Sequence, residues 1–305
     1  MSESRKIIEG VIVPLLTLLD EQERIDEPAM RALIRHCLDG GADGIFVGGT
    51  SGFGPLLPDD QWKRLMEIAR DEVENSVPLL GGIIAASTTR AVKRIEILEQ
   101  IGFEHMVVTP TFYVTLTRRE EFLTHFDGCR RATDMNMIVY NIPQCTGAAI
   151  PLDTIAEMVR LGWTKVVKES SGDKDYFLKL TRAVSESKTT LLQGNEPDIA
   201  WGLSIGAKGM VPVCANYAPK LFAAAWHASQ EGDETRLGKL QERINSIRET
   251  LLEGDKSWLA GAMYSVQTLG IGKGKVIRPI QELSDKQKKE IEDLTESNPI
   301  SDITI

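Results

Sequence analysis

Short apolar runs alternate with amphipathic stretches along the first 230 residues. Each run is bounded by Gly, Pro or polar residues and lacks the strict apolar–polar alternation of a half-exposed strand. This pattern is typical of parallel strands that are buried on both faces. The runs begin near Val11, Gly44, Pro78, Glu104, Asn136, Thr164, Thr189 and Gly209.

The stretches between these runs carry apolar residues at helical spacing, such as Leu33, Cys37 and Leu38 in the first of them. An Asp at position 26 directly before Glu27-Pro28 is a typical helix start. The pattern predicts helices over 27–38, 59–73, 88–100, 119–132, 152–159, 173–184 and 217–229. It predicts three further helices, over 231–253, 256–269 and 285–295, with no strand between them.

The spacing of the runs indicates the fold class. They recur about every 28 residues, which is the length of one strand–helix unit. Eight such units predict an α/β fold, a closed (β/α)8 TIM barrel over residues 1–230, followed by a C-terminal helical appendage over 231–305. A doubly wound open sheet is the alternative, and the count of eight favours the barrel.

Composition narrows the possible partners and the compartment. The 305 residues include 35 Lys or Arg and 44 Asp or Glu, a net charge of −9 that argues against nucleic-acid binding. No apolar run approaches the length of about 20 residues that a membrane span needs, and the N-terminal sequence lacks the apolar core of a signal peptide. We therefore expect a cytoplasmic protein that binds neither nucleic acid nor membrane.

The cysteines and histidines do not suggest a metal site. The four cysteines are widely spaced and form no CxxC pair, and the four histidines show no HExxH spacing. We expect no metal and no disulfide framework. The cysteines are Cys37, Cys129, Cys145 and Cys214.

Lys168 is the first candidate for chemistry, because it follows Val166-Val167 at the end of the sixth apolar run. Catalytic groups of a TIM barrel come from the C-terminal ends of the strands. Burial there would lower the pKa of the amine, and a neutral amine can attack a carbonyl to form a Schiff base. The alternative is a lysine paired with Glu169 or another acid at the barrel rim.

Two further segments lie at the same end of the predicted barrel. Tyr140 ends the fifth run and could shuttle protons, or could simply be a rim aromatic bonded to backbone. Glycines in the 49–54 loop, with the hydroxyls of Thr50 and Ser51, would suit a small carboxylate or phosphate. This loop matches neither a Walker motif nor a dinucleotide fingerprint, and a turn without ligand is the alternative.

Taken together, these residues resemble the dihydrodipicolinate synthase / N-acetylneuraminate lyase family of pyruvate-dependent Schiff-base aldolases. The resemblance runs from about residue 10 to residue 216 in order and spacing. Four signatures carry it: Gly49-Thr50-Ser51-Gly52, Tyr140-Asn141-Ile142-Pro143, Lys168-Glu169-Ser170-Ser171-Gly172-Asp173 and Gly209-Met210-Val211-Pro212-Val213-Cys214-Ala215-Asn216.

The resemblance implies a role for each matched residue. Lys168 would form the imine with pyruvate or a 2-oxo acid, Tyr140 would shuttle protons, and Thr50 with Ser51 would hold the carboxylate. Thr50 is also expected to be a catalytic residue, together with Lys168 and Tyr140. Val211, in the fourth signature, is expected to be a further substrate contact. No cofactor is expected because the imine itself delocalises the carbanion, and a homotetramer or homodimer is expected from the family.

Several positions depart from the synthase pattern. Cys145 occupies the place of an arginine that binds the carboxylate of the aldehyde partner, and a thiol offers no cationic fork. Phe112 aligns with a second relay tyrosine that synthases donate across a subunit interface; neighbouring Tyr113 is the candidate to compensate. Phe53 replaces a glutamate. These departures weigh against lysine biosynthesis.

Other positions favour a hydroxylated substrate. Ser170 offers a hydroxyl where synthases tend to have alanine and sugar-acid lyases have threonine. Asn195 and Glu196 follow the seventh run, where sialic acid lyases place acids against sugar hydroxyls, although the second such acid falls on Pro197. For Glu196, a helix N-terminal acid is the alternative.

The sequence thus predicts a lysine Schiff-base lyase or aldolase that acts on a 2-oxo acid, with a 2-oxo-3-deoxy sugar acid favoured. Dihydrodipicolinate synthase is the runner-up, and a dehydratase using the same imine is third. Two other classes stay open: a phosphate-binding barrel isomerase or epimerase, and a non-catalytic paralogue that binds a 2-oxo acid.

Overall fold

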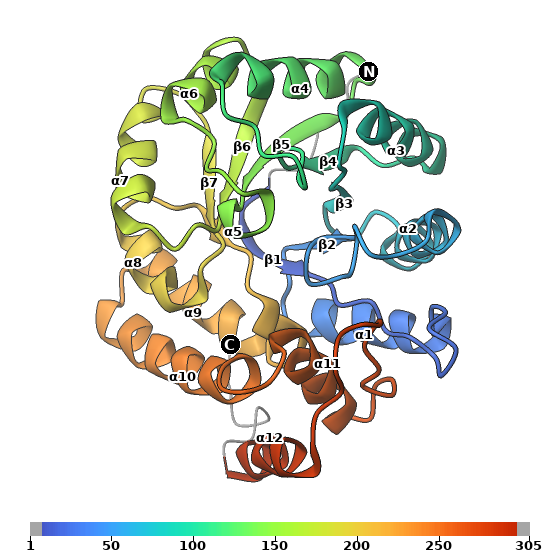
Figure 1. The fold of residues 1–305 in the computed structure, drawn as a ribbon. Coiled ribbons are helices and arrows are strands. Elements are labelled where there is room, and N and C mark those ends of the chain that lie inside the picture. The colour runs from blue at the N-terminus through green and yellow to red at the C-terminus, as the bar shows by residue number, and fades with distance from the viewer. Residues whose placement is uncertain (1–7, 298–305) are drawn as a thin grey trace.

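A computed structural model describes residues 8–297 and contains the predicted barrel (Figure 1). Eight parallel strands pair in chain order, and the last pairs with the first to close the barrel. The strands are β1 Gly10–Pro14, β2 Gly44–Val47, β3 Leu79–Ile83, β4 His105–Val108, β5 Asn136–Asn141, β6 Thr164–Glu169, β7 Thr190–Gln193 and β8 Gly209–Met210.

Helices surround the barrel as the apolar spacing predicts, so the prediction of an α/β barrel with C-terminal helices is confirmed. The main helices are α1 Glu27–Asp39, α2 Asp59–Val73, α3 Thr88–Ile101, α4 Arg119–Arg131, α6 Leu152–Arg160, α7 Lys174–Ala183, α9 Pro219–Glu231, α10 Glu234–Leu252, α11 Trp258–Thr268 and α12 Asp285–Ser297. The Asp26 carboxylate caps α1 by accepting from Ala29 N at 3.2 Å.

Short elements at the strand exits were missed by the sequence pattern. They are α5 Pro143–Thr146, α8 Ile199–Ser204 and the 3-10 turns η1 Glu196–Asp198 and η2 Val213–Asn216. One or two turns are too short to show a helical period. The eighth strand is also shorter than its apolar run, because Pro212 has no N–H to donate to the sheet and the chain turns into η2.

Alternate strand residues build two separate apolar layers. Side chains such as Ile12, Leu80 and Leu192 form a cluster inside the barrel, whereas Val11 and Val13 pack outward against the helices. This alternation follows from the two-residue period of a strand. A side chain near the carboxyl end of a strand that points inward therefore lies at the mouth of a packed interior, which places functional groups there.

The C-terminal helices pack against the barrel at its α9 side (Figure 1). Ile244, Ile247 and Met263 belong to the same continuous core as the residues between strands and outer helices. Along the described chain, no helix is both long and apolar enough to cross a membrane.

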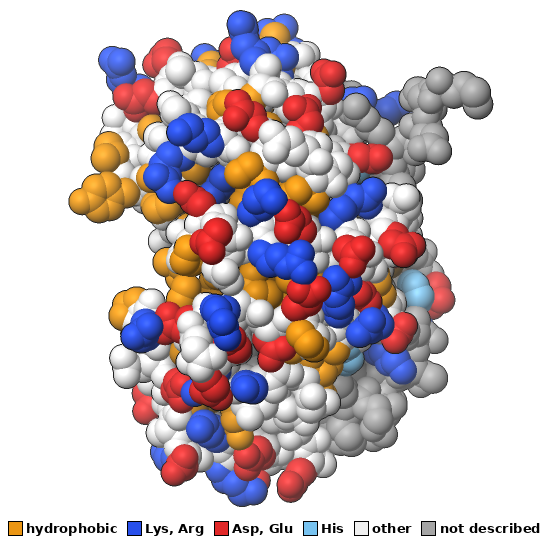
Figure 2. Space-filling view, turned by 90° about the vertical axis from the view of Figure 1, so that its right-hand side faces the viewer, with side chains coloured by type: hydrophobic (Ala, Val, Ile, Leu, Met, Phe, Trp, Pro, Cys, Tyr) orange, Lys and Arg blue, Asp and Glu red, His pale blue; other side chains and the backbone are white. Residues whose placement is uncertain are grey.

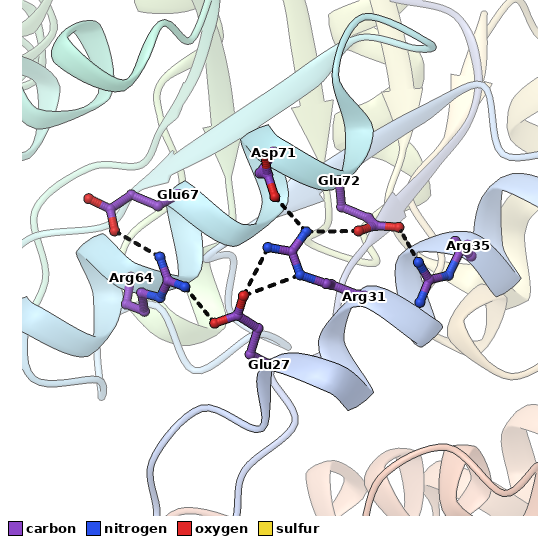
Figure 3. Close-up of polar contacts among 7 residues, drawn as sticks. All are labelled: Glu27, Arg31, Arg35, Arg64, Glu67, Asp71 and Glu72. Carbon is purple, nitrogen blue, oxygen red and sulfur yellow. Dashed lines mark hydrogen bonds and ion pairs between the residues drawn. The ribbon is translucent and has the colours of Figure 1, made fainter.

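An ion-pair network joins α1 to α2 on the outer surface (Figure 3). The Arg31 guanidinium contacts Glu27 at 2.8 Å, Asp71 at 2.6 Å and Glu72 at 2.9 Å. Glu27 also pairs with Arg64 of α2 at 2.5 Å. Figure 2 shows this side of the molecule, where basic and acidic side chains are interspersed.

Candidate active site

Lys168 and Tyr140 lie side by side inside the barrel mouth. The parallel register of β5 and β6 pairs these two residues directly. The Lys168 Nζ atom lies 3.9 Å from the centre of the Tyr140 ring and 4.9 Å from that of Phe46. Both residues are almost fully buried, at 5% and 3% exposure. The structure therefore brings the two principal sequence candidates together.

Burial gives Lys168 an amine that titrates near neutrality. Desolvation lowers the pKa of Lys168 from 10.5 to about 7. The alternative that Lys168 pairs with Glu169 is wrong. Glu169 instead accepts hydrogen bonds from Asn141 Nδ2 at 3.0 Å and Ser171 N at 2.7 Å, and Lys168 forms no ion pair within residues 8–297. The lowered pKa favours the neutral, nucleophilic form of the amine.

Tyr140 is a buried phenol that two hydroxyl groups face. Burial raises the pKa of Tyr140, while the hydroxyls of Ser170 and Thr50 act in the opposite direction because they favour the phenolate. The Phe46 ring meets the Tyr140 ring edge-on at 6.3 Å. Tyr140 is therefore held in place by apolar contacts and remains protonated at neutral pH.

The loop after β2 carries Thr50 and Ser51 and is fixed against its neighbours. The Ser51 hydroxyl donates to Pro14 O at 3.0 Å, and the Thr17 hydroxyl donates to Gly52 O at 2.6 Å. A Cβ atom on Gly82 of β3 would lie 2.2 Å from Gly48 O, so the loop backbone approaches β3 as closely as only glycine permits. The Ser51 hydroxyl is therefore engaged by the end of β1.

Ser170 directly follows β6 and is held by its backbone. Its N–H donates to Asn141 O at 3.0 Å, and its carbonyl accepts from Gln144 Nε2 at 2.9 Å. Ser170 lies two residues beyond Lys168 and so shares its inward face. The serine hydroxyl is enclosed next to Gly194 and the Tyr140 phenol.

Glu196 and Val211 lie at the exits of β7 and β8. Glu196 is 5% exposed; its Oε1 accepts from Cys214 N at 2.8 Å, and its Oε2 is buried without a hydrogen bond to the described residues. Burial raises the pKa of Glu196. Val211 is buried in the inner cluster, with its N–H donating to Gln193 O at 2.8 Å. Both residues thus lie at the strand exits where the sequence predicted substrate contacts.

Tyr113 is the predicted site residue that the structure does not bring to Lys168 within one chain. Its side chain is 95% exposed and its φ is +75°, in the left-handed region that non-glycine residues rarely adopt. Cys145, on α5 beside the mouth, is exposed and unoxidised.

Phe46 is a site residue that sequence reasoning missed. Phe46 lies in an apolar run with no polar neighbour to mark it as functional. The two-residue period of the strand nevertheless points its side chain into the barrel, beneath the lysine. Asn141 was quoted in a signature without a role, and Glu169 was considered only as a partner of Lys168. Their mutual hydrogen bond ties the ends of β5 and β6 together.

The β6 and β7 exits also carry a polar cluster at the rim. Asp198 accepts a hydrogen bond from Asn195 Nδ2 at 2.6 Å and forms an ion pair with Lys174 at 2.9 Å. This acid lies two residues after Glu196 and was not predicted from the sequence. Across residues 8–297, no three His, Cys, Asp or Glu side chains converge to form a metal site.

The fold and this geometry define an α/β barrel with a reactive-lysine site at the carboxyl ends of its strands. Comparison with protein families gives the narrower assignment. The model of the dihydrodipicolinate synthetase family matches residues 7–298, and the chain belongs to this family.

Curated relatives include both lyases and synthases. The chain is 30% identical to an uncharacterized DapA-like lyase of Halobacterium salinarum over 285 residues, 93% of this chain and 92% of that protein. It is 29% identical to 4-hydroxy-tetrahydrodipicolinate synthase of Methanothermobacter thermautotrophicus, covering 80% of this chain and 87% of that one. N-acetylneuraminate lyase of Salmonella paratyphi B is 27% identical, with 81% and 83% covered.

Solved structures agree on the architecture. Dihydrodipicolinate synthase from Bacteroides thetaiotaomicron superposes with a TM-score of 0.90 at 24% identity, covering 95% of this chain and 98% of that one. The family is therefore established, together with its lyase and synthase character, while its members act on different substrates.

Proposed function

We propose that this protein is a class I lyase that forms a Schiff base through Lys168 and breaks or makes a carbon–carbon bond to a pyruvate unit. The observation that carries the proposal is the buried Lys168 amine, with a pKa near 7, against the Tyr140 ring. Such an amine is nucleophilic at neutral pH and has no competing carboxylate partner within the described residues.

The proposed reaction begins with attack of the neutral amine on the keto carbon of a 2-oxo acid. Water leaves and a protonated imine forms. Removal of a proton from the substrate's C4 hydroxyl then breaks the C3–C4 bond, and the electron pair is delocalised onto the imine nitrogen as an enamine. Protonation and hydrolysis release pyruvate and an aldehyde. Tyr140 would move the protons in these steps.

Binding of the carboxylate is assigned to the loop after β2. The Thr50 hydroxyl and the Thr50 and Ser51 backbone N–H groups would hold it, and Val211, which directly follows β8, would be a further contact. Ser170 and Glu196 are assigned to hydroxyl groups of the substrate. A 2-oxo-3-deoxy sugar acid is the favoured substrate class, because these contacts are polar and Cys145 supplies no positive charge for a second carboxylate.

Assembly is part of the proposal. Tyr113, exposed and held at a positive φ, is the group that a second copy of the chain would take up in a homodimer or homotetramer. Dihydrodipicolinate synthase is the second candidate function, because the match to a curated 4-hydroxy-tetrahydrodipicolinate synthase covers 87% of the length of that relative. Cys145 in place of the family's arginine disfavours it.

Borohydride trapping tests the proposal directly. The protein is incubated with pyruvate, reduced with borohydride, and its intact mass and proteolytic peptides are measured. We expect one adduct per chain on Lys168 and none in Lys168→Ala, whereas Lys165→Ala, a matched variant at an exposed position of the same strand, should still be labelled. An unmodified chain, or an adduct on another lysine, would refute the assignment.

A further inference from the structure

Arg94 is a charged residue on the buried face of helix α3. That face also carries Ala91, Ile95 and Leu98, and Arg94 is 8% exposed among them. Arginine is rarely buried unless protein groups satisfy its charge and its donors. The guanidinium faces Asp59 at 3.4 Å, but the Asp59 side chain is 72% exposed, so water screens this attraction. The reason for burying the charge therefore lies in its other contacts.

Two of these contacts join the loops that leave β2 and β3. The Arg94 Nη1 atom donates hydrogen bonds to Gly54 O at 3.2 Å and to Ile84 O at 3.0 Å. Ile84 directly follows β3, and Gly54 lies in the loop that begins at Gly48, directly after β2. The guanidinium thus links two strand exits from the side of the outer helices.

The start of the same loop packs on the aromatic partner of Arg94. The guanidinium carbon lies 4.9 Å from the centre of the Trp62 ring of α2. A Cβ atom at Gly48 would lie 3.2 Å from the Trp62 indole nitrogen. Arg94 and Trp62 together therefore contact both ends of the loop 48–54, which carries the groups assigned to the substrate carboxylate.

The backbone of this loop has a shape that its surroundings must maintain. Phe53 adopts a φ of +55°, in the left-handed region that costs energy for a residue with a side chain. The Gly54 N–H donates to Gly49 O at 3.0 Å, and a Cβ atom at Gly54 would lie 1.9 Å from Gly48 O. A turn this tight and strained persists only where neighbouring groups hold it.

We infer that Arg94 is a positioning residue for carboxylate binding, which holds the loop after β2 in the shape that presents Thr50 and Ser51 to the substrate. The inference rests on the proposed function, which assigns the carboxylate to these two residues. Arg94 acts through the Gly54 carbonyl and does not contact the substrate. Its loss would let the loop relax, and a displacement of about 1 Å in a binding group can cost as much as about 100-fold.

Borohydride trapping with two compounds tests this role. Pyruvate carries the carboxylate, whereas pyruvamide has the same keto group beside an uncharged amide, and both can form an imine with Lys168. The measurement is the concentration of each compound that gives half-maximal labelling, read from the intact mass. For Arg94→Met, we expect this concentration to rise about 10- to 100-fold for pyruvate and to change less than about threefold for pyruvamide. The small change for pyruvamide would report an intact Lys168 site.

Arg90→Met is the matched control. Arg90 lies one turn earlier on α3 and faces the same Asp59 at 3.8 Å, but its side chain is 62% exposed. Its loss removes the same charge from the same helix, so labelling by both compounds should match the wild type. Arg94→Lys keeps a cation but lacks the planar fork, and the change specific to pyruvate should be smaller, about 3- to 10-fold.

Other results would overturn the inference. Equal changes for the two compounds in Arg94→Met, or loss of labelling by both, would assign Arg94 to the fold. Labelling within about twofold of wild type for both would show that the loop keeps its shape without the guanidinium. Should Arg94→Met fail to fold, Arg94→Lys carries the comparison, and an unchanged preference for pyruvate would contradict the role. Absence of pyruvate labelling in the wild-type protein would instead refute the proposed function.

Discussion

Replacement of Lys168 by methionine is expected to stabilise the folded chain while it abolishes the proposed chemistry. The lysine lies in an apolar layer with two aromatic rings around its amine, and burial lowers its pKa from 10.5 to about 7. The side chain that would form the imine is therefore one that destabilises the native state. Methionine has a similar length and no charge to desolvate.

The size of the effect follows from proton linkage. At 1.36 kcal/mol per pH unit, the fall in pKa corresponds to a free-energy cost of about 5 kcal/mol for burying the charged amine. Attraction between the ammonium group and the two aromatic rings offsets about 1 to 2 kcal/mol of this cost. Because the native pKa is the lower one, the unfolded chain holds the extra proton between pH 7 and 10.5. The cost is thus complete below pH 7 and disappears as the pH rises through this window.

The assay is urea unfolding of wild type and Lys168→Met from pH 6 to pH 9. We expect the variant to be more stable by about 3 to 4 kcal/mol at pH 6, with the difference shrinking by about 3 kcal/mol at pH 9. Lys165→Met, on the exposed side of the same strand, is the control and should show no such trend. A stability difference that does not change with pH, or a destabilised Lys168→Met, would refute the reasoning.

Four further outcomes are expected. The rate of pyruvate trapping should rise with pH through an apparent pKa near 7, since the neutral Lys168 amine reacts; a flat profile from pH 6 to 8 contradicts this. Tyr140→Phe should lower kcat by about 10²- to 10⁴-fold with folding intact by circular dichroism. Gly82→Ala should lower both Tm and kcat, because its methyl group would displace Gly48 and the loop that follows it. Unchanged Tm and kcat would contradict this, since the loop would then accommodate the methyl group. Arg31→Met should cost about 1 kcal/mol in low salt and less in 1 M NaCl, measured by urea unfolding, and equal costs in both would exclude an electrostatic origin.

The barrel could be predicted from the sequence because its strands are largely buried on both faces and most of its outer helices carry an apolar stripe. These periodicities are local properties, so the pattern located the strands without any knowledge of their pairing. The short helix α5 and the early end of β8 escaped the prediction for the same reason. The residues at which these elements begin and end depend on Pro212 and Pro143 and on the closure of the barrel. A short stretch of sequence gives no information about that closure.

The site was predictable as far as strand ends determine it. Lys168 and Tyr140 meet because neighbouring parallel strands bring the same end of each into register. The inward face of Phe46 could be read from the alternation of β2, whereas its distance from the amine and the enclosure of the Ser170 hydroxyl are set by packing and were beyond the sequence. Tyr113 projects away from its own chain, so its role depends on a surface that a single chain does not supply.

The pairing of β1 with β8, here called the seam, affects how the chain folds during its synthesis on the ribosome. Only two residue pairs join these strands, and the Asn216 side chain completes the seam by bonding Leu16 N and Pro14 O at 3.0 Å across 200 residues. β1 is synthesised first, but both of its edges can be paired only after nearly the last segment of the barrel has been synthesised. Long-range closure of this kind is slow, and β1 stays exposed to wrong pairing meanwhile. We expect assembly of the mouth, and with it competence for chemistry, to be the final event of folding.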